Sequence, residues 1–213
     1  MIEKLLEGLS KNNVQLVAVS KTRSNAQVME LYKKGQRLFG ENRVQELVQK
    51  HSDLPKDISW HLIGHLQTNK VKQIAAFIDL IHSVDSLRLL KEINKQAAGH
   101  NRTINVLIQI HIAQEEQKYG FDEKALDELL EAIEDSEFPN IEIHGLMGMA
   151  TYTDDESQIR KEFSSLTLLF EKLKTHPALG NAFQIKSMGM SGDYKLAIEE
   201  GSNMVRIGSL LFA

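Results

Sequence analysis

The sequence predicts an α/β protein in which eight strands, with the helices between them, close into a single (β/α)8 TIM barrel. Short β-rich runs alternate with longer segments of helical period along the whole chain. Several of these runs, such as residues 106–110, are almost continuously apolar, which is typical of parallel strands buried on both faces. No linker rich in Gly, Ser or Pro interrupts the alternation, so we expect residues 1–213 to form one domain. A doubly wound open sheet is the structural alternative.

The predicted elements follow one another in a regular order. The strands are predicted at residues 15–20, 37–40, 59–63, 80–83, 105–111, 142–147, 182–187 and 204–207. Helical patterns cover residues 25–34, 43–51, 68–76, 86–99, 123–136, 156–174 and 193–200. In the long helix 156–174, an apolar stripe that should face the barrel consists of Ile159, Phe163, Leu166, Leu169, Phe170 and Leu173.

Residues suited to helix ends support these boundaries. Ser24 or Asn25 and Ser86 are predicted N-caps, because their side chains can accept a hydrogen bond from the first helical turn. Gly35 and Gly99 are predicted C-terminal stops, since glycine adopts the left-handed conformation there without a Cβ clash.

Composition excludes several classes of protein. The chain has no cysteine, so a disulfide framework, a thiolate zinc site and a catalytic thiol are excluded, and a reducing cytoplasm suits it. A net charge of −4 and the lack of a basic cluster with interleaved aromatics argue against a nucleic-acid partner. The apolar runs are only strand-length, so we expect neither a membrane span nor a signal peptide.

In a parallel barrel, the residues directly after each strand meet at one end and form the active site. Lys21 follows the apolar run at 16–19 of the first predicted strand. Buried strands around a lysine disfavour its ammonium form, and the free amine then attacks an aldehyde to form a Schiff base. Lys21 is therefore a Schiff-base candidate, and an exposed lysine at the start of a loop is the alternative.

Two loops near the C-terminus suit a phosphate group. The segment 187–193, Ser-Met-Gly-Met-Ser-Gly-Asp, precedes a predicted helix and offers backbone N–H groups and the Ser191 hydroxyl. Gly208 and Ser209 follow the eighth strand, and barrels often build a phosphate site from loops seven and eight. Arg206 lies in that last strand among apolar residues, so it either faces a ligand at the barrel mouth or pairs with a buried carboxylate. Ordinary glycine-rich turns are the alternative for the loops.

Other motifs are weak or absent. No dinucleotide, Walker A or nucleophile-elbow pattern follows a predicted strand. Five histidines lie in or beside strands, but no pair has the His-Glu-x-x-His spacing of a helical metal site, so we predict no metal. These histidines are His61, His65, His82, His111 and His144. The methionines at 147–149, 188 and 190 are interpreted as barrel packing.

Six segments together resemble the pyridoxal phosphate homeostasis proteins, the YggS-type family of single barrels similar to the N-terminal domain of alanine racemase. These segments are Ala-Val-Ser-Lys-Thr at 18–22, Phe-Gly-Glu-Asn at 39–42, Trp-His-Leu-Ile-Gly-His-Leu-Gln-Thr-Asn-Lys at 60–70, His-Gly-Leu-Met at 144–147, Ser-Met-Gly-Met-Ser-Gly-Asp at 187–193 and Val-Arg-Ile-Gly at 205–208. They occur in the family's order and span most of the chain.

The resemblance implies a site for pyridoxal 5′-phosphate (PLP). It implies that Lys21 holds PLP as a Schiff base and that Arg206 faces the pyridine nitrogen. The phosphate would be bound by Ser191, Gly208 and Ser209.

The resemblance also implies further contacts around the cofactor, and the chain differs from the family pattern at two places. It makes Asn42 a ring-side contact and Met147 and Ser187 pocket walls. The chain reads Thr-Arg-Ser at 22–24, where Thr-Lys-Pro is common in the family, and Asn203 stands where threonine is frequent. The loop after the first strand and the rim of the phosphate site are therefore expected to differ in detail.

An arginine beside the ring nitrogen makes PLP a poorer electron sink than a carboxylate would. Alanine racemase also uses a tyrosine from a second domain, which we expect to be missing here, so no residue is assigned a catalytic role. The resemblance thus implies binding, sequestration and delivery of PLP, with PLP-dependent apo-enzymes as recipients, by a monomer in the cytoplasm. A weak PLP-dependent amino-acid racemase and a Schiff-base aldolase acting through Lys21 are the alternatives.

Overall fold

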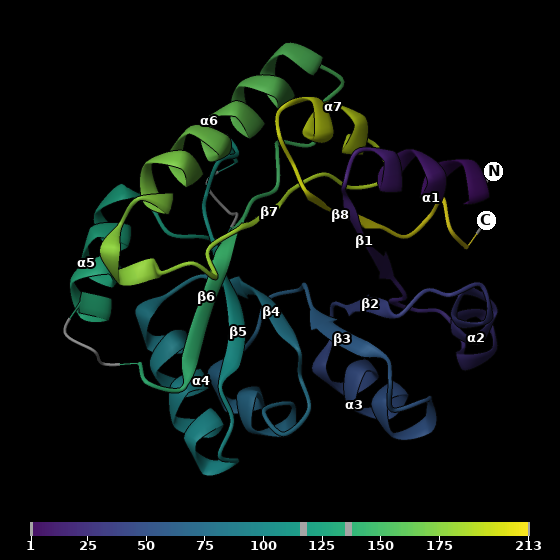
Figure 1. The fold of residues 1–213 in the computed structure, drawn as a ribbon, viewed down its shortest axis with the longest axis horizontal. Helices are drawn as coiled ribbons and strands as arrows, with labels where there is room; N and C mark the ends of the chain where they lie inside the picture. Colours follow the sequence, from purple (N-terminus) through teal and green to yellow (C-terminus); the bar gives the residue numbers. More distant parts are fainter. Residues whose placement is uncertain (1, 116–118, 135–137, 213) are drawn as a thin grey trace.

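The computed structural model describes residues 2–115, 119–134 and 138–212. Within them, eight parallel strands close into a barrel in sequence order, which confirms the predicted fold (Figure 1). The strands are β1 (Gln15–Val19), β2 (Leu38–Glu41), β3 (Ser59–Leu62), β4 (Leu80–Val84), β5 (Ile104–Gln109), β6 (Ile141–Met147), β7 (Ile185–Ser187) and β8 (Met204–Ile207).

Helices connect successive strands and surround the barrel (Figure 1). They are α1 (Ile2–Lys11), α2 (Asn25–Lys33), α3 (Val44–Asp53), η1 (Thr68–Gln73), α4 (Leu87–Gly99), α5 (Glu123–Glu134), α6 (Glu156–Lys174), η2 (Pro177–Leu179) and α7 (Tyr194–Glu199). The predicted stripe of α6 is confirmed: Phe163 and Leu166 are fully buried, and Leu169 is half-buried.

The barrel closes between the first and the last strand. Ala18 pairs with Ile207 and Val17 with Arg206, so the two ends of the chain meet in one sheet. Leu6 of α1 and Leu211 line the same small hollow, and both termini lie on this side of the molecule (Figure 1). A site at the mouth beside β1 and β8 is therefore assembled from both ends of the sequence.

Side chains along each strand alternate between two cores, because successive residues of a strand point to opposite faces. The outer core lies between strands and helices and contains Leu16 and Ala18. A smaller cluster contains Val17 together with Leu80, Leu107, Met147 and Met204. The continuous apolar runs in the sequence thus reflect burial on both faces, as parallel strands require.

Most predicted helix ends are confirmed. Ser24 caps α2 in a reciprocal capping box with Gln27, and Ser86 accepts a hydrogen bond from Leu89 N. Gly35 takes a φ of +97° after α2. The predicted stop at Gly99 is wrong: α4 includes Gly99, and Asn101 adopts the left-handed conformation with φ +51°, which asparagine tolerates.

Three further predictions need correction. The helix predicted at 68–76 is the 3₁₀ segment η1, because bonds such as Lys70 N to Gln67 O (2.9 Å) span three residues. The strand predicted at 182–187 pairs only from Ile185. The helix α1, which packs through Leu5, Leu6 and Leu9, was not predicted. The end of the helix predicted at 123–136 lies outside the described residues.

Within the described parts of the chain, every helix falls short of the length or the apolar character needed to cross a bilayer.

Candidate functional site

A cavity of about 600 Å³ opens at the C-terminal ends of β1, β2, β3, β6, β7 and β8. Its walls bring together six of the eight residues that the sequence predicted for the site. These six are Lys21, Asn42, Ser191, Arg206, Gly208 and Ser209. Residues up to 188 positions apart in the chain meet because parallel strands end on the same side of a barrel (209 − 21 = 188).

The turn that carries Lys21 is held on both sides of the lysine. Before it, Ser20 O accepts a hydrogen bond from Lys50 Nζ (2.6 Å), and Ser20 Oγ donates to Glu41 Oε1 (2.7 Å). After it, Thr22 N donates to Glu46 Oε2 (2.8 Å), and Thr22 takes a left-handed φ of +63°. The backbone at Lys21 is thus fixed by neighbours, while its side chain is exposed.

The lysine itself is exposed at the mouth of the cavity. The sequence-based expectation that the buried strands desolvate the Lys21 amine is therefore wrong, because Lys21 lies two residues beyond the end of β1 at Val19. Any desolvation of the amine has to come from a bound molecule that covers it.

Beneath this turn, Glu41 and Lys50 form a buried ion pair. Lys50 Nζ lies 2.6 Å from Glu41 Oε1, and the side chains are 7% and 0% exposed. Burial raises the pKa of Glu41, and the hydrogen bonds from Lys50 and Ser20 oppose that rise. The second carboxylate oxygen, Glu41 Oε2, is buried without a hydrogen-bond partner. A buried pair of this kind adds little net stability but is costly to break.

The two loops predicted to share a phosphate are in contact. Gly208 N donates a hydrogen bond to Ser191 Oγ (3.3 Å), which joins the loop before α7 to the end of β8. Asp193 Oδ1 accepts from Met190 N (2.5 Å) and closes the turn around Ser191. A Cβ added at Gly192 would meet no atom within 4 Å, so the rim there is open to a ligand.

Arg206 is a buried cation at the floor of the cavity. Its Nη1 donates to Ser187 O and Ser187 Oγ, both at 2.7 Å, and its Nη2 donates to Gly148 O at 3.0 Å. Burial lowers the pKa of Arg206 to about 10, which the charge of Asp193 opposes. The sequence left open whether Arg206 faces the barrel mouth or pairs with a buried carboxylate. In the structure it lies at the floor of the cavity and is hydrogen-bonded to neutral oxygens.

Two predicted site residues do not line the cavity. Ser187 is fully buried and reaches the cavity only through its hydrogen bonds to Arg206. Met147 is fully buried in the smaller core cluster with Val17, and Met149 lines the cavity instead. Met147 lies beneath the cavity, because Ile63 and Met149, which line the cavity, pack against the cluster that contains Met147.

The sequence analysis missed the loop that follows β6. Thr151 and Tyr152 line the cavity, and Tyr152 is 99% exposed at its mouth. Glu162 of α6 holds this loop, accepting hydrogen bonds from Thr151 N (2.6 Å) and Thr151 Oγ1 (2.8 Å). The signal for this loop is its place directly after β6, because residues that follow strand ends form the site of a parallel barrel.

The histidines are arranged differently from a metal centre. His61 Nδ1 and His82 Nε2 are 3.0 Å apart inside the barrel, whereas His65 stacks on Tyr119 and contacts Asp85 at the surface. In the part of the chain that the structure describes, no three His, Asp or Glu side chains gather as metal ligands.

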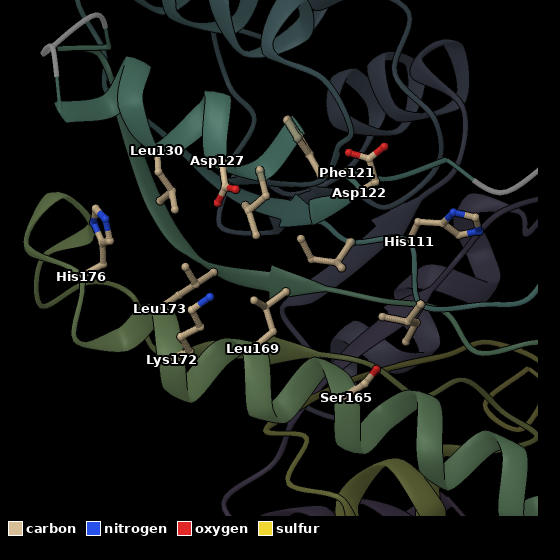
Figure 2. Close-up of a pocket in the computed structure, with 13 residues that line it drawn as sticks. His111, Phe121, Asp122, Asp127, Leu130, Ser165, Leu169, Lys172, Leu173 and His176 are labelled. Atoms are coloured by element: carbon tan, nitrogen blue, oxygen red, sulfur yellow. The ribbon is translucent and has the colours of Figure 1, made fainter. Parts of the chain in front are cut away.

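A larger cavity of about 670 Å³ lies outside the barrel, between α5 and α6. Figure 2 shows Leu130 and Asp127 of α5 facing Leu169 and Lys172 of α6 across it. Its walls are mainly hydrocarbon side chains, and it contains none of the predicted site residues.

The barrel and the position of its polar cavity define a class of proteins. A family model described as "Alanine racemase, N-terminal domain" matches residues 2–213. Alanine racemase from Clostridium difficile 630 has the same fold at 16% identity, with a TM-score of 0.73 over 97% of this chain and 54% of that chain. The chain therefore has the barrel of the alanine racemase N-terminal domain and spans about half of that racemase.

More similar proteins define the family within this class. The pyridoxal phosphate homeostasis protein of Aquifex aeolicus is 40% identical over 99% of this chain and 92% of its own length. The structure of PipY from Synechococcus elongatus is 34% identical over the whole of both chains, with a TM-score of 0.88 without PLP and 0.87 with PLP bound. The chain belongs to the family of pyridoxal phosphate homeostasis proteins.

Proposed function

We propose that this protein binds PLP in the cavity at the mouth of the barrel and acts in PLP homeostasis, holding the cofactor for delivery. Lys21 holds PLP through a Schiff base, and Arg206 faces the ring nitrogen. Ser191, Gly208 and Ser209 bind the phosphate. The single observation that carries the proposal is the convergence of these residues on one cavity of about 600 Å³.

The residues present fit the chemistry of PLP. An aldehyde needs an accessible amine, and Lys21 is exposed at the cavity. A phosphate needs hydroxyl and backbone N–H donors with room to approach, which Ser191 and the open rim at Gly192 provide. Asn42 also lines the cavity and serves as the ring-side contact. Ser187 contributes to this site by accepting a hydrogen bond from Arg206. Met147 contributes by packing in the core cluster beneath the cavity.

The charge of Arg206 favours holding the cofactor over turning over amino acids. PLP, when bound, supplies an electron sink whose strength depends on protonation of its ring nitrogen. With a pKa of about 10, Arg206 stays charged at neutral pH and acts there as a hydrogen-bond donor, because a guanidinium has no acceptor atom. It therefore holds the ring without promoting its protonation.

The proposal extends to partners, oligomeric state and location. The relatives that carry the name pyridoxal phosphate homeostasis protein support a handling role. We propose PLP-dependent apo-enzymes as recipients, a monomeric state and a cytoplasmic location. Transfer of PLP to an apo-enzyme, sedimentation and fractionation of cells test these three points separately.

The first test is the dependence of PLP binding on Lys21. We expect the PLP-incubated protein to show a visible absorption band that borohydride removes, leaving a reduced adduct on the peptide that contains Lys21. Lys21→Arg keeps the positive charge but cannot form the Schiff base, so the band should be lost.

Lys70→Ala is the matched control, since Lys70 lines a neighbouring polar hollow that also includes Asn42. Its band and its adduct should equal those of the wild type. A colourless wild type, or an adduct on another lysine, would contradict the proposal.

Weak amino-acid racemisation is the second candidate, and Tyr152 is the observation that favours it. Racemisation needs a second acid/base group opposite the lysine, and the Tyr152 phenol stands at the mouth of the same cavity. Robust turnover of an amino acid that Lys21→Arg and Tyr152→Phe both abolish would replace storage by catalysis as the main function. Turnover of phosphosugars without added PLP would instead indicate an aldolase.

A further inference from the structure

A file of buried polar side chains crosses the barrel behind Arg206. Ser187, His82 and His61 come from β7, β4 and β3, and none is more than 2% exposed. His82 Nδ1 lies 3.0 Å from Ser187 Oγ, and His82 Nε2 lies 3.0 Å from His61 Nδ1. The file therefore begins at the partner of Arg206 and leads away from the cavity.

The file ends at a surface carboxylate. His61 Nε2 lies 3.4 Å from Ser59 Oγ, which in turn donates a hydrogen bond to Asp79 Oδ2. The direct distance from His61 Nε2 to Asp79 Oδ2 is 3.8 Å, so Ser59 bridges the two groups. Ser59 begins β3 and Asp79 precedes β4, which puts this end of the file at the N-terminal side of the barrel.

The hydrogen-bond partners fix the direction of every proton in the file. Arg206 can only donate, so Ser187 Oγ accepts from Arg206 Nη1. Among the hydrogen bonds of the described residues, the remaining acceptor for the Ser187 hydroxyl is His82 Nδ1. A neutral His82 then carries its proton on Nε2 and donates to His61 Nδ1, and His61 donates from Nε2 toward Ser59 and Asp79.

The electrostatics of the two ends agree with this direction. Burial lowers the pKa of His82 well below its usual value, the positive charge of Arg206 acts in the same direction, and His82 therefore stays neutral. The neighbouring His61 and the hydrogen bond from Ser59 lower the pKa of Asp79, which keeps the far end negative. A positive and a negative terminus polarise the intervening hydrogen bonds in the same sense.

We propose that His82 and His61 are positioning residues that couple Arg206 to Asp79 through this directed file and thereby fix the guanidinium at the floor of the cofactor cavity. Apolar side chains would fill the same space without the desolvation of two imidazoles. The role of the two histidines is therefore to orient the Arg206 guanidinium. The inference rests on the proposed function in that the group Arg206 faces is the PLP ring.

The apoprotein gives the first test, because it needs no cofactor. In ¹⁵N-histidine-labelled protein, long-range proton–nitrogen NMR reports which ring nitrogen carries the proton. We expect the proton of each ring on Nε2, with Nδ1 of His82 and Nδ1 of His61 both unprotonated. A proton on Nδ1 of His82, or a charged His82, would overturn the proposal.

The second test changes Asp79, at the far end of the file, and measures the effect on PLP bound in the cavity. Asp79→Asn removes the negative terminus at a half-exposed position, so the fold should survive. We expect the His61 signals to show a mixture of tautomers, the visible PLP band to shift, and PLP to dissociate about threefold faster. In His82→Leu, which breaks the file, dissociation should be about tenfold faster, as expected for loss of a hydrogen bond that orients a charged group.

Glu142→Gln is the matched control. Glu142 lies at the start of β6, at the same end of the barrel as Asp79. Its side chain is 53% exposed, like that of Asp79, and Glu142 Oε2 lies 2.8 Å from His144 Nε2. It has no link to the file, so its band and dissociation rate should match the wild type. If Asp79→Asn behaves like Glu142→Gln, the proposal is wrong, even if His82→Leu fails to fold. If the wild type binds no PLP, the proposed function fails, and the tautomers of the apoprotein still decide this inference.

Discussion

Lys21 owes its position to the hydrogen bonds of its neighbours in the chain, Ser20 and Thr22. The peptide groups on either side of it form hydrogen bonds with the side chains of Lys50 and Glu46 of α3. The Ser20 hydroxyl donates a hydrogen bond to Glu41 at the end of β2. Fixing the backbone lowers the entropy lost when a ligand binds, while an exposed side chain keeps the amine accessible. The structure thus combines a hydrogen-bonded turn with an accessible amine.

The ion pair under this turn leads to a prediction about stability. Burial raises the pKa of Glu41, so the folded protein holds that proton more tightly than the unfolded chain does. The stability from this effect is present below the ordinary value of 4.5 and is lost as the pH rises through the folded-state value. Lys50 opposes the rise, so we expect Lys50→Met to destabilise the protein by about 3 kcal/mol at pH 7.5 and by clearly less at pH 4.5.

Urea unfolding at the two pH values measures this difference. Glu41→Gln combined with Lys50→Met should recover part of the loss, since no buried charge is then left unpaired. Lys11→Met removes an exposed pair with Glu7 and should leave stability unchanged. An equal loss from Lys50→Met at both pH values would show that charge on Glu41 is not the cause.

Among the elements, β6 depends on one glycine. Gly145 has a φ of +149°, and a Cβ there would lie 1.9 Å from Ile185 O in β7. The pairing of β5 with β6 also shifts at this point, from Val106↔Ile143 to Leu107↔Gly145, so His144 is an extra residue in the strand. Only a residue without a side chain lets β7 approach this bulge.

Substitution at Gly145 tests that dependence. We expect Gly145→Ala to lower the free energy of unfolding by about 4 kcal/mol or more, because the added carbon meets backbone that cannot move aside. Gly35→Ala is the control: its φ is +97°, but an added Cβ meets nothing within 4 Å, so only about 1 kcal/mol of backbone strain is expected. Similar losses for the two variants, measured by thermal unfolding, would refute the role of close packing.

Most strands and helices, and the site residues at strand ends, could be predicted because each leaves a pattern within a short stretch of sequence. The strands are identified by apolar runs, and Lys21, Ser191 and Arg206 by their place at strand ends. The residues that hold the site in place could not be predicted in this way, because their partners lie far away in the sequence. Lys50 meets Ser20 from 30 residues away, and His82 meets Ser187 from 105 residues away, so only the closed barrel brings these pairs together.

For the whole molecule, barrel closure and the candidate site involve the same strands. β1 and β8 pair along four residues, and the PLP contacts proposed for Lys21, Arg206 and Gly208 flank that seam. A ligand that binds only the folded state stabilises it in proportion to the logarithm of its concentration over Kd, about 2.7 kcal/mol at one hundred times Kd. We expect this stabilisation to be largest at the seam between β1 and β8.

Hydrogen exchange with and without PLP tests this concentration. The backbone amides of β1, β8 and α7 should exchange more slowly when PLP is bound, because each opening of the seam then requires loss of the ligand. The amides of β5 lie away from the seam and should change less. In Lys21→Ala the difference should shrink, since only the phosphate and ring contacts remain. Uniform protection over all eight strands would mean instead that the barrel opens only as a whole, and that the seam is as stable as the rest of the sheet.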